Sequence, residues 1–141
     1  MKKIIVLLIG SIDYDSRVQK EISNFISLGY VVTLFLWNWE PYKYKKKNVR
    51  IINAKLGNYV IRDKKWTFMT RFLNFIRYWY FSSKEVKKGN FKFIHCNDLI
   101  TLGVVFFLPK RYHKNVVYDV HDLVPERYKK KGVKYFFWGF A

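Results

Sequence analysis

Polar side chains that could bind or transform a substrate gather where three apolar runs of this sequence end. The runs cover residues 3–10, 91–96 and 117–120. In chain order, the polar residues at their ends are Ser11, Asp13, Asp15, Arg17, His95, Asn97, Asp98, His121, Asp122 and Glu126. Apolar runs of this kind are typical of buried parallel strands, and open α/β sheets bind ligands beyond the carboxyl ends of such strands. We therefore expect binding or acid–base chemistry along one edge of one sheet.

Several familiar site motifs are missing from these positions. The loop after the first run has one glycine, Gly10, and two carboxylates, Asp13 and Asp15, so it is neither a G-x-G-x-x-G turn nor a Walker loop. A G-x-S-x-G nucleophile motif is absent as well. His95 and Cys96 are neighbours whose side chains point to opposite faces of a strand, and no metal-ligand spacing of Cys and His occurs. The sequence disfavours a dinucleotide dehydrogenase and predicts no metal site.

Hydrophobic periodicity predicts alternating strands and helices around these sites. We expect a helix over residues 16–28, closed by Gly29 and started by a capping box of Ser16 and Gln19. Further helices are predicted at 65–87 and 99–108, and strands at 3–10, 30–37, 49–54, 91–96 and 115–120. This alternation predicts an α/β fold, a Rossmann-like doubly wound parallel sheet with flanking helices, in a single domain of 141 residues.

The helix predicted at 65–87 is strongly amphipathic. Apolar residues of one face are Phe68, Met69, Phe72, Leu73, Phe75, Ile76 and Trp79. Packing against the sheet and contact with a membrane interface both explain such a stripe. The second interpretation makes Trp66, Arg71, Arg77 and Tyr78 candidates for facing a membrane.

Composition limits the class of partner and the compartment. The formal charge of +17, from 27 Lys and Arg against 10 Asp and Glu, attracts nucleic acid or anionic lipid, although a lysine-rich composition that serves solubility gives the same number. No apolar run approaches the length of a membrane span, and no cleavage site follows the apolar start. Cys96 is the only cysteine, which favours a reducing cytoplasm over export.

Four segments together resemble the amino-terminal domain of family 4 glycosyltransferases. They are Asp15-Ser-Arg-Val-Gln-Lys-Glu21, Leu28-Gly-Tyr-Val-Val-Thr-Leu34, Ile94-His-Cys-Asn-Asp98 and Val117-Val-Tyr-Asp-Val-His-Asp-Leu-Val-Pro-Glu126. The resemblance implies the amino-terminal half of a GT-B fold and retaining transfer of a sugar from a nucleotide-sugar. The implied acceptors are surface glycans of the lipopolysaccharide or capsule type, some of them lipid-linked, built at the inner face of the cell membrane.

The resemblance also implies roles for individual residues. His121 matches a histidine near the reacting sugar and is the expected catalytic residue, while Arg17 matches a basic residue that meets an anionic substrate. Asp13, Asp98, Asp122 and Glu126 are expected to help bind the substrate. Structural roles stay open beside these: Asp98 and Asp122 also fit helix caps, and Arg17 fits an ion pair with Asp13 or Asp15.

The resemblance implies that donor binding belongs to a carboxyl-terminal domain, which we expect to be absent from these 141 residues. No cofactor is expected here, and the nucleotide-sugar would be bound mainly by the absent domain, supplied in cis or by a partner chain. We expect the 141 residues alone to be inactive. Two alternatives remain: a basic module that binds nucleic acid or a membrane, and a non-catalytic flavodoxin-like scaffold. A nucleic-acid role is disfavoured because no single-strand platform is recognisable.

Overall fold

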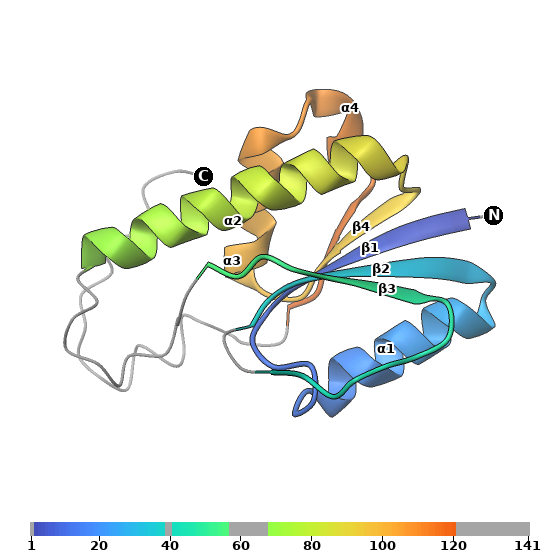
Figure 1. Cartoon of the computed structure of the whole chain (residues 1–141). Helices are drawn as coiled ribbons and strands as arrows, with labels where there is room; N and C mark the ends of the chain where they lie inside the picture. The colour runs from blue at the N-terminus through green and yellow to red at the C-terminus, as the bar shows by residue number, and fades with distance from the viewer. Residues whose placement is uncertain (1, 39–40, 57–67, 121–141) are drawn as a thin grey trace.

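The computed structural model describes residues 2–38, 41–56 and 68–120. In chain order its elements are β1 (Lys2–Ile9), α1 (Ser16–Ser27), β2 (Tyr30–Trp37), β3 (Val49–Asn53), α2 (Phe68–Gly89), β4 (Phe93–Cys96), α3 (Leu99–Leu102), the 3-10 helix η1 (Gly103–Phe107), α4 (Lys110–His113) and β5 (Val116–Tyr118). The five strands form one parallel sheet in the order β3-β2-β1-β4-β5 (Figure 1). The predicted doubly wound α/β fold is confirmed.

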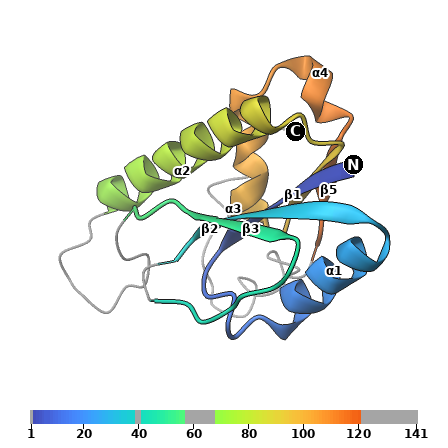
Figure 2. The same cartoon turned by 45° about the vertical axis from the view of Figure 1, so that its right-hand side comes forward.

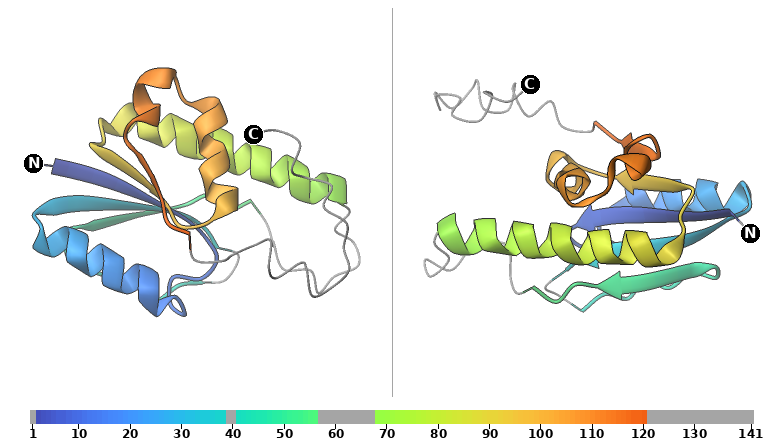
Figure 3. Two further views of the ribbon diagram at one scale, coloured as in Figure 1. Left: turned by 180° about the vertical axis from the view of Figure 1, so that it is seen from behind. Right: turned by 90° about the horizontal axis from the view of Figure 1, so that it is seen from above.

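Helices cover both faces of the sheet, because side chains of the central strand alternate between two apolar layers. Ile4, Val6 and Leu8 of β1 pack with α1 on one face. Ile5 and Leu7 pack on the other face with residues of α2, η1 and neighbouring strands. Figures 2 and 3 show α1 on one side of the sheet and α2 with α3 on the other. Most residues of the central strands β1, β2 and β4 are consequently buried on both faces, as in other parallel sheets.

The first helix begins at Ser16 as predicted, but its cap is one residue earlier than expected. Asp15 is the N-cap, and its Oδ1 accepts a hydrogen bond from the backbone N–H of Val18 at 3.1 Å. Gln19 is not part of a capping box with Ser16, because its Nε2 donates instead to the carbonyls of Ile12 and Asp13. The predicted closure at Gly29 is confirmed, since its φ of 80° is the left-handed conformation that suits a glycine after a helix.

The buried face of α2 differs from the predicted one. Tyr78 is fully buried rather than membrane-facing, and its hydroxyl donates to the carbonyls of Phe35 at 3.2 Å and Leu8 at 3.4 Å. Met69 and Leu73, expected in the core, are 61% and 46% exposed. Apolar residues surround most of this helix, so periodicity could not identify the buried side. Tyr78 is buried because the sheet provides aromatic neighbours for its ring and backbone carbonyls that accept from its hydroxyl.

The helix predicted at 99–108 is divided into α3 and η1 at Gly103. A Cβ at Gly103 would lie 2.2 Å from the ring of Trp79, whose Nε1 donates to the Ile100 carbonyl at 2.6 Å. Close approach of α2 therefore requires the glycine and a tighter turn. The short helix α4 that follows was not predicted, because Pro109 reads as the end of a helix rather than as the residue before a new one.

Candidate functional site

The carboxyl ends of β1 and β4 lie side by side at the point where the strand order reverses. Connections from β1 lead to β2 on one side, whereas β4 lies on the other side of β1. Asn97 follows β4 and joins the two ends, because its backbone N–H and its Nδ2 both donate to the Leu7 carbonyl. Open α/β sheets bind ligands outside this point. The carboxyl ends of β1, β4 and β5 therefore lie at one edge of the sheet, as predicted, with Asp13 and Asn97 beyond the first two. The polar residues expected after β5, from His121 to Glu126, lie outside the described residues.

Asp13 holds the loop after β1 to a distant segment of chain. Its two carboxylate oxygens accept hydrogen bonds from the backbone N–H groups of Lys43 and Tyr44, each at 2.7 Å. An open pocket of about 550 Å³ lies between the two segments. Its lining residues are Asp13, Tyr14, Pro41, Lys43, Tyr44 and Lys45. The pocket therefore combines aromatic surface with two exposed lysines beyond the end of β1.

Arg17 and Asp98 have the structural roles that the sequence analysis kept as alternatives to substrate binding. Arg17 forms an exposed ion pair with Asp15 at 3.3 Å. Asp98 caps α3, where its Oδ1 accepts from the Thr101 N–H at 2.8 Å and the Thr101 hydroxyl completes the capping box. Such a cap contributes about 1 kcal/mol. A binding role for either residue stays a prediction.

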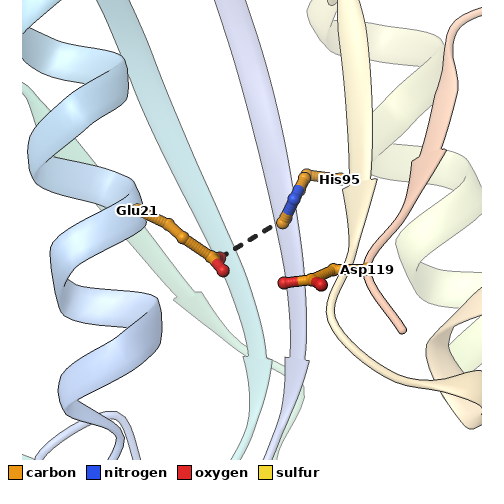
Figure 4. Close-up of side chains that lie close together, drawn as sticks. All are labelled: Glu21, His95 and Asp119. Carbon is orange, nitrogen blue, oxygen red and sulfur yellow. Dashed lines mark ion pairs between the residues drawn. The ribbon is translucent and has the colours of Figure 1, made fainter. Parts of the chain in front are cut away.

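Three side chains from separate elements meet on the face of the sheet that carries α1. Glu21 comes from α1, His95 from β4 and Asp119 directly follows β5 (Figure 4). One potential ligand atom of each lies within 4.8 Å of the other two. His95 Nδ1 is 3.8 Å from Glu21 Oε2, which is longer than a hydrogen bond. We call these three residues the carboxylate–histidine cluster.

The cluster is mostly shielded from water. The side chains of His95 and Glu21 are 9% and 21% exposed. Burial, a hydrogen bond with Asp119 and the negative charge of Asp119 raise the pKa of Glu21 to about 7, against a smaller opposing effect of Arg17. Near neutral pH Glu21 can therefore either hold or release a proton.

The neighbouring strand positions separate two potential reactive groups. His95 belongs to the α1 face, whereas Cys96 lies in the apolar layer on the opposite face, as the sequence predicted. Burial raises the pKa of the Cys96 thiol to about 12, so it is protonated at neutral pH. Cys96 therefore contributes to packing rather than to nucleophilic chemistry.

The structure does not describe several of the other predicted site residues. His121, Asp122, Glu126 and Trp66 lie outside the described residues, and the side chain of Arg71 is not described. Arg77 is exposed on α2 and donates to Asn74 Oδ1 at 3.4 Å, and its contact with a membrane stays a prediction.

Sequence reasoning missed Glu21 and Asp119 as members of a site. Each nevertheless has a sequence feature that could have indicated a buried polar position. Glu21 lies beside buried Ile22 on the helix, and Asp119 interrupts an apolar run within a buried-strand pattern. What the sequence could not supply was the parallel pairing of β4 with β5, which places Asp119 next to His95. The lack of a Cys and His spacing therefore did not exclude a cluster of possible metal ligands.

Among the described residues, no helix is both long and apolar enough to cross a bilayer. No protein-family model and no curated protein matches the chain.

Solved structures do share its fold. Sucrose-phosphate synthase from Thermosynechococcus elongatus superposes with a TM-score of 0.69 at 15% identity, over 92% of this chain and 35% of that one. TcCGT1, solved in complex with UDP, superposes with a TM-score of 0.62 at 10% identity, over 94% of this chain and 32% of that one. The chain thus spans about a third of the length of each. The parallel sheet with helices on both faces is therefore a glycosyltransferase-like fold, the Rossmann-like α/β architecture of the GT-B class.

Proposed function

We propose that this chain is the amino-terminal, acceptor-side domain of a retaining family 4 glycosyltransferase. The complete enzyme would transfer a sugar from a nucleotide-sugar to a surface-glycan acceptor of the lipopolysaccharide or capsule type. The observation that carries the proposal is the pocket beyond β1, at the ligand-binding edge of a GT-B-like sheet. The four-segment resemblance in the sequence supports the same assignment independently of the fold.

The pocket has the surface chemistry that a glycan acceptor needs. Tyr14 and Tyr44 offer aromatic surface against which a sugar ring can pack, while Lys43 and Lys45 can bind an anionic sugar or a lipid-linked phosphate. Asp13 fixes the geometry, because its two hydrogen bonds hold the lysine-bearing segment in place. This domain's contribution to the reaction is to orient the acceptor hydroxyl toward the anomeric carbon of the donor.

His121 is the proposed catalytic residue beside the reacting sugar, with Asp122 and Glu126 in the same segment. Its place in the chain supports this role, since it comes two residues after Asp119 at the carboxyl end of β5. The departing diphosphate would be stabilised by the donor-binding domain. TcCGT1 was solved with UDP, and by analogy we propose a nucleoside diphosphate sugar as donor.

The transfer reaction tests the proposal in the native gene product. Nucleotide-sugars are screened as donors, and the rate is compared between wild type, His121→Ala and the matched control His113→Gln on α4. We expect His121→Ala to lower kcat by about 100-fold, the typical contribution of acid–base catalysis, and His113→Gln to leave it unchanged. An unchanged rate in His121→Ala would remove this residue from the site, and no transfer from any donor would reject the enzyme assignment.

The second domain is tested by the intact mass of the same native product. A species of about twice 17.2 kDa or more would mean that the donor-binding domain is present in cis. A species of 17.2 kDa would mean that the domain must come from a partner chain, which co-purification from the native cell would then identify.

We propose a peripheral location at the inner face of the membrane, with α2 as the contact. Exposed Met69, Phe72 and Leu73 occupy the start of this helix, and exposed Arg77 and Lys84 follow along it. Apolar side chains beside cations suit an anionic bilayer surface, and the net charge of +17 strengthens the attraction.

Sedimentation with phosphatidylglycerol vesicles tests this location. We expect Met69→Ser with Leu73→Ser to weaken binding about tenfold, and the control Phe106→Ser, which removes an exposed aromatic residue from η1, to have little effect. Equal binding of all three proteins would show that α2 is not the contact.

A further inference from the structure

We propose that the carboxylate–histidine cluster is a binding site for one divalent transition-metal ion, such as zinc or manganese. The ligands would be one imidazole nitrogen of His95 and one carboxylate oxygen each from Glu21 and Asp119. This site is separate from the proposed acceptor pocket and does not depend on the proposed transfer reaction.

The donor set suits such an ion. Imidazole nitrogen binds zinc and other first-row metals, whereas carboxylate oxygens also suit manganese. Two carboxylates compensate both charges of a divalent cation. Three protein ligands leave room for water or a substrate group in a further position, as in catalytic rather than structural zinc sites.

The distances require only a small closure of the side chains. Because the three ligand atoms lie within 4.8 Å of one another, an ion at their centre would be at most about 2.8 Å from each. Zinc binds nitrogen and oxygen ligands at about 2.0–2.2 Å. Each side chain would therefore move inward by roughly 0.6 to 0.8 Å, which a glutamate on a helix and an aspartate after a strand can achieve by small torsional changes.

Three rigid elements hold the cluster in position. His95 is fixed in the middle of the sheet, where β4 pairs with β1 on one side and β5 on the other, and its ring lies edge-on to Phe25 at 5.4 Å. The Asp119 N–H donates to the Cys96 carbonyl at 2.9 Å, which fixes the backbone beyond β5. Sites built on strands and helices are positioned more precisely than sites on loops.

The cluster lies near the partly exposed edge strand β5. Val117, which shares this face of β5 with Asp119, is 44% exposed, and Glu21 and Asp119 are themselves partly exposed. Arg17 is one helical turn from Glu21, but its guanidinium is paired with Asp15. The ligand set is therefore mostly buried yet close to solvent at the edge of the sheet, which suits a site that exchanges its ion.

Metal titration of the 141-residue chain tests the proposal. The chain is stripped with a chelator and titrated with Zn²⁺ in a calorimeter, as wild type and as the variants Glu21→Gln and Asp119→Asn. Asp15→Asn is the matched control, because it removes one nearby negative charge while asparagine still caps α1. We expect one ion per wild-type chain, at least about tenfold weaker binding in the two ligand variants, and nearly unchanged binding in the control.

A measurement on the wild-type chain avoids dependence on the folding of the variants. Substoichiometric Mn²⁺ broadens NMR signals near its site, so the ring signals of His95 should broaden well before those of exposed His113. Several outcomes would overturn the proposal: no one-to-one binding, ligand variants that bind as tightly as wild type, an equal loss in Asp15→Asn, or His95 signals that broaden no earlier than those of His113. The last two results would indicate general attraction of cations to surface charge.

Discussion

Replacing Glu21 with glutamine should change how the stability of this protein depends on pH. Burial and the neighbouring carboxyl of Asp119 raise the pKa of Glu21 from 4.5 to about 7. Between these two values the folded chain binds more protons than the unfolded chain. The free energy of unfolding therefore falls as the pH rises through this window, because the folded state must accept a disfavoured charge. Glutamine has a similar shape and does not titrate.

The size of the effect follows from the pKa difference. One pKa unit corresponds to about 1.36 kcal/mol, so a rise from 4.5 to about 7 sets an upper bound of about 3.4 kcal/mol. The side chain of Glu21 is 21% exposed and solvent screens part of its interaction with Asp119. We therefore expect about 1–2 kcal/mol. Wild type should lose this amount relative to Glu21→Gln between pH 5 and pH 8.

Urea unfolding in the presence of a chelator measures the difference. Curves for wild type, Glu21→Gln and the control Asp15→Asn are recorded at half-unit pH intervals, and the free energy of each variant is compared with that of wild type. The gap between wild type and Glu21→Gln should open in favour of the variant as the pH rises toward 7 and then stay constant. A gap that stays the same from pH 5 to pH 8 would refute the argument that burial and Asp119 keep Glu21 protonated.

Substitutions at Tyr78, Gly103 and Asp98, two of them with a control, test two packing contacts and one helix cap. Tyr78→Phe should lower the free energy of unfolding by about 1 kcal/mol through loss of the buried hydroxyl's hydrogen bonds, whereas Tyr80→Phe on the exposed side should change it little; equal effects in urea unfolding would contradict the burial of Tyr78. Gly103→Ala should cost about 1–3 kcal/mol by forcing the ring of Trp79 to move, and an unchanged melting temperature would show that this contact is not tight. Asp98→Ala should cost about 0.5–2 kcal/mol whereas Asp98→Asn should keep the cap; if Asp98→Asn impaired acceptor binding without loss of stability, Asp98 would have a binding role as well.

The strands and most helices were predictable because their hydrophobic patterns are strong and local. β2 has the predicted bounds of residues 30–37, and the closure of α1 at Gly29 follows from a conformational preference of one residue. The order of strands and helices also favoured a parallel sheet. These features depend on interactions between near neighbours in sequence, so the amino-acid pattern contains them.

The buried face of α2 and the division at Gly103 depended on the partner surface. Tyr78 reads as a polar boundary residue on a helical wheel, and only the carbonyls of β1 and β2 make its burial favourable. Trp79 reaches across to Ile100, and this contact decides where the following helix tightens. Periodicity describes one helix at a time, whereas burial depends on two elements at once.

The sequence alone determined the α/β class, the edge at which polar strand ends meet, and the large positive charge, because each follows from local pattern or composition. Only the tertiary structure decided that Asp13 anchors the pocket and that Glu21, His95 and Asp119 form one cluster. Glu21 and Asp119 are almost a hundred residues apart in the chain. They meet because β4 and β5 pair in parallel beside β1 while α1 packs across the same face. Such proximity is set by strand order and register, which no single segment of sequence contains.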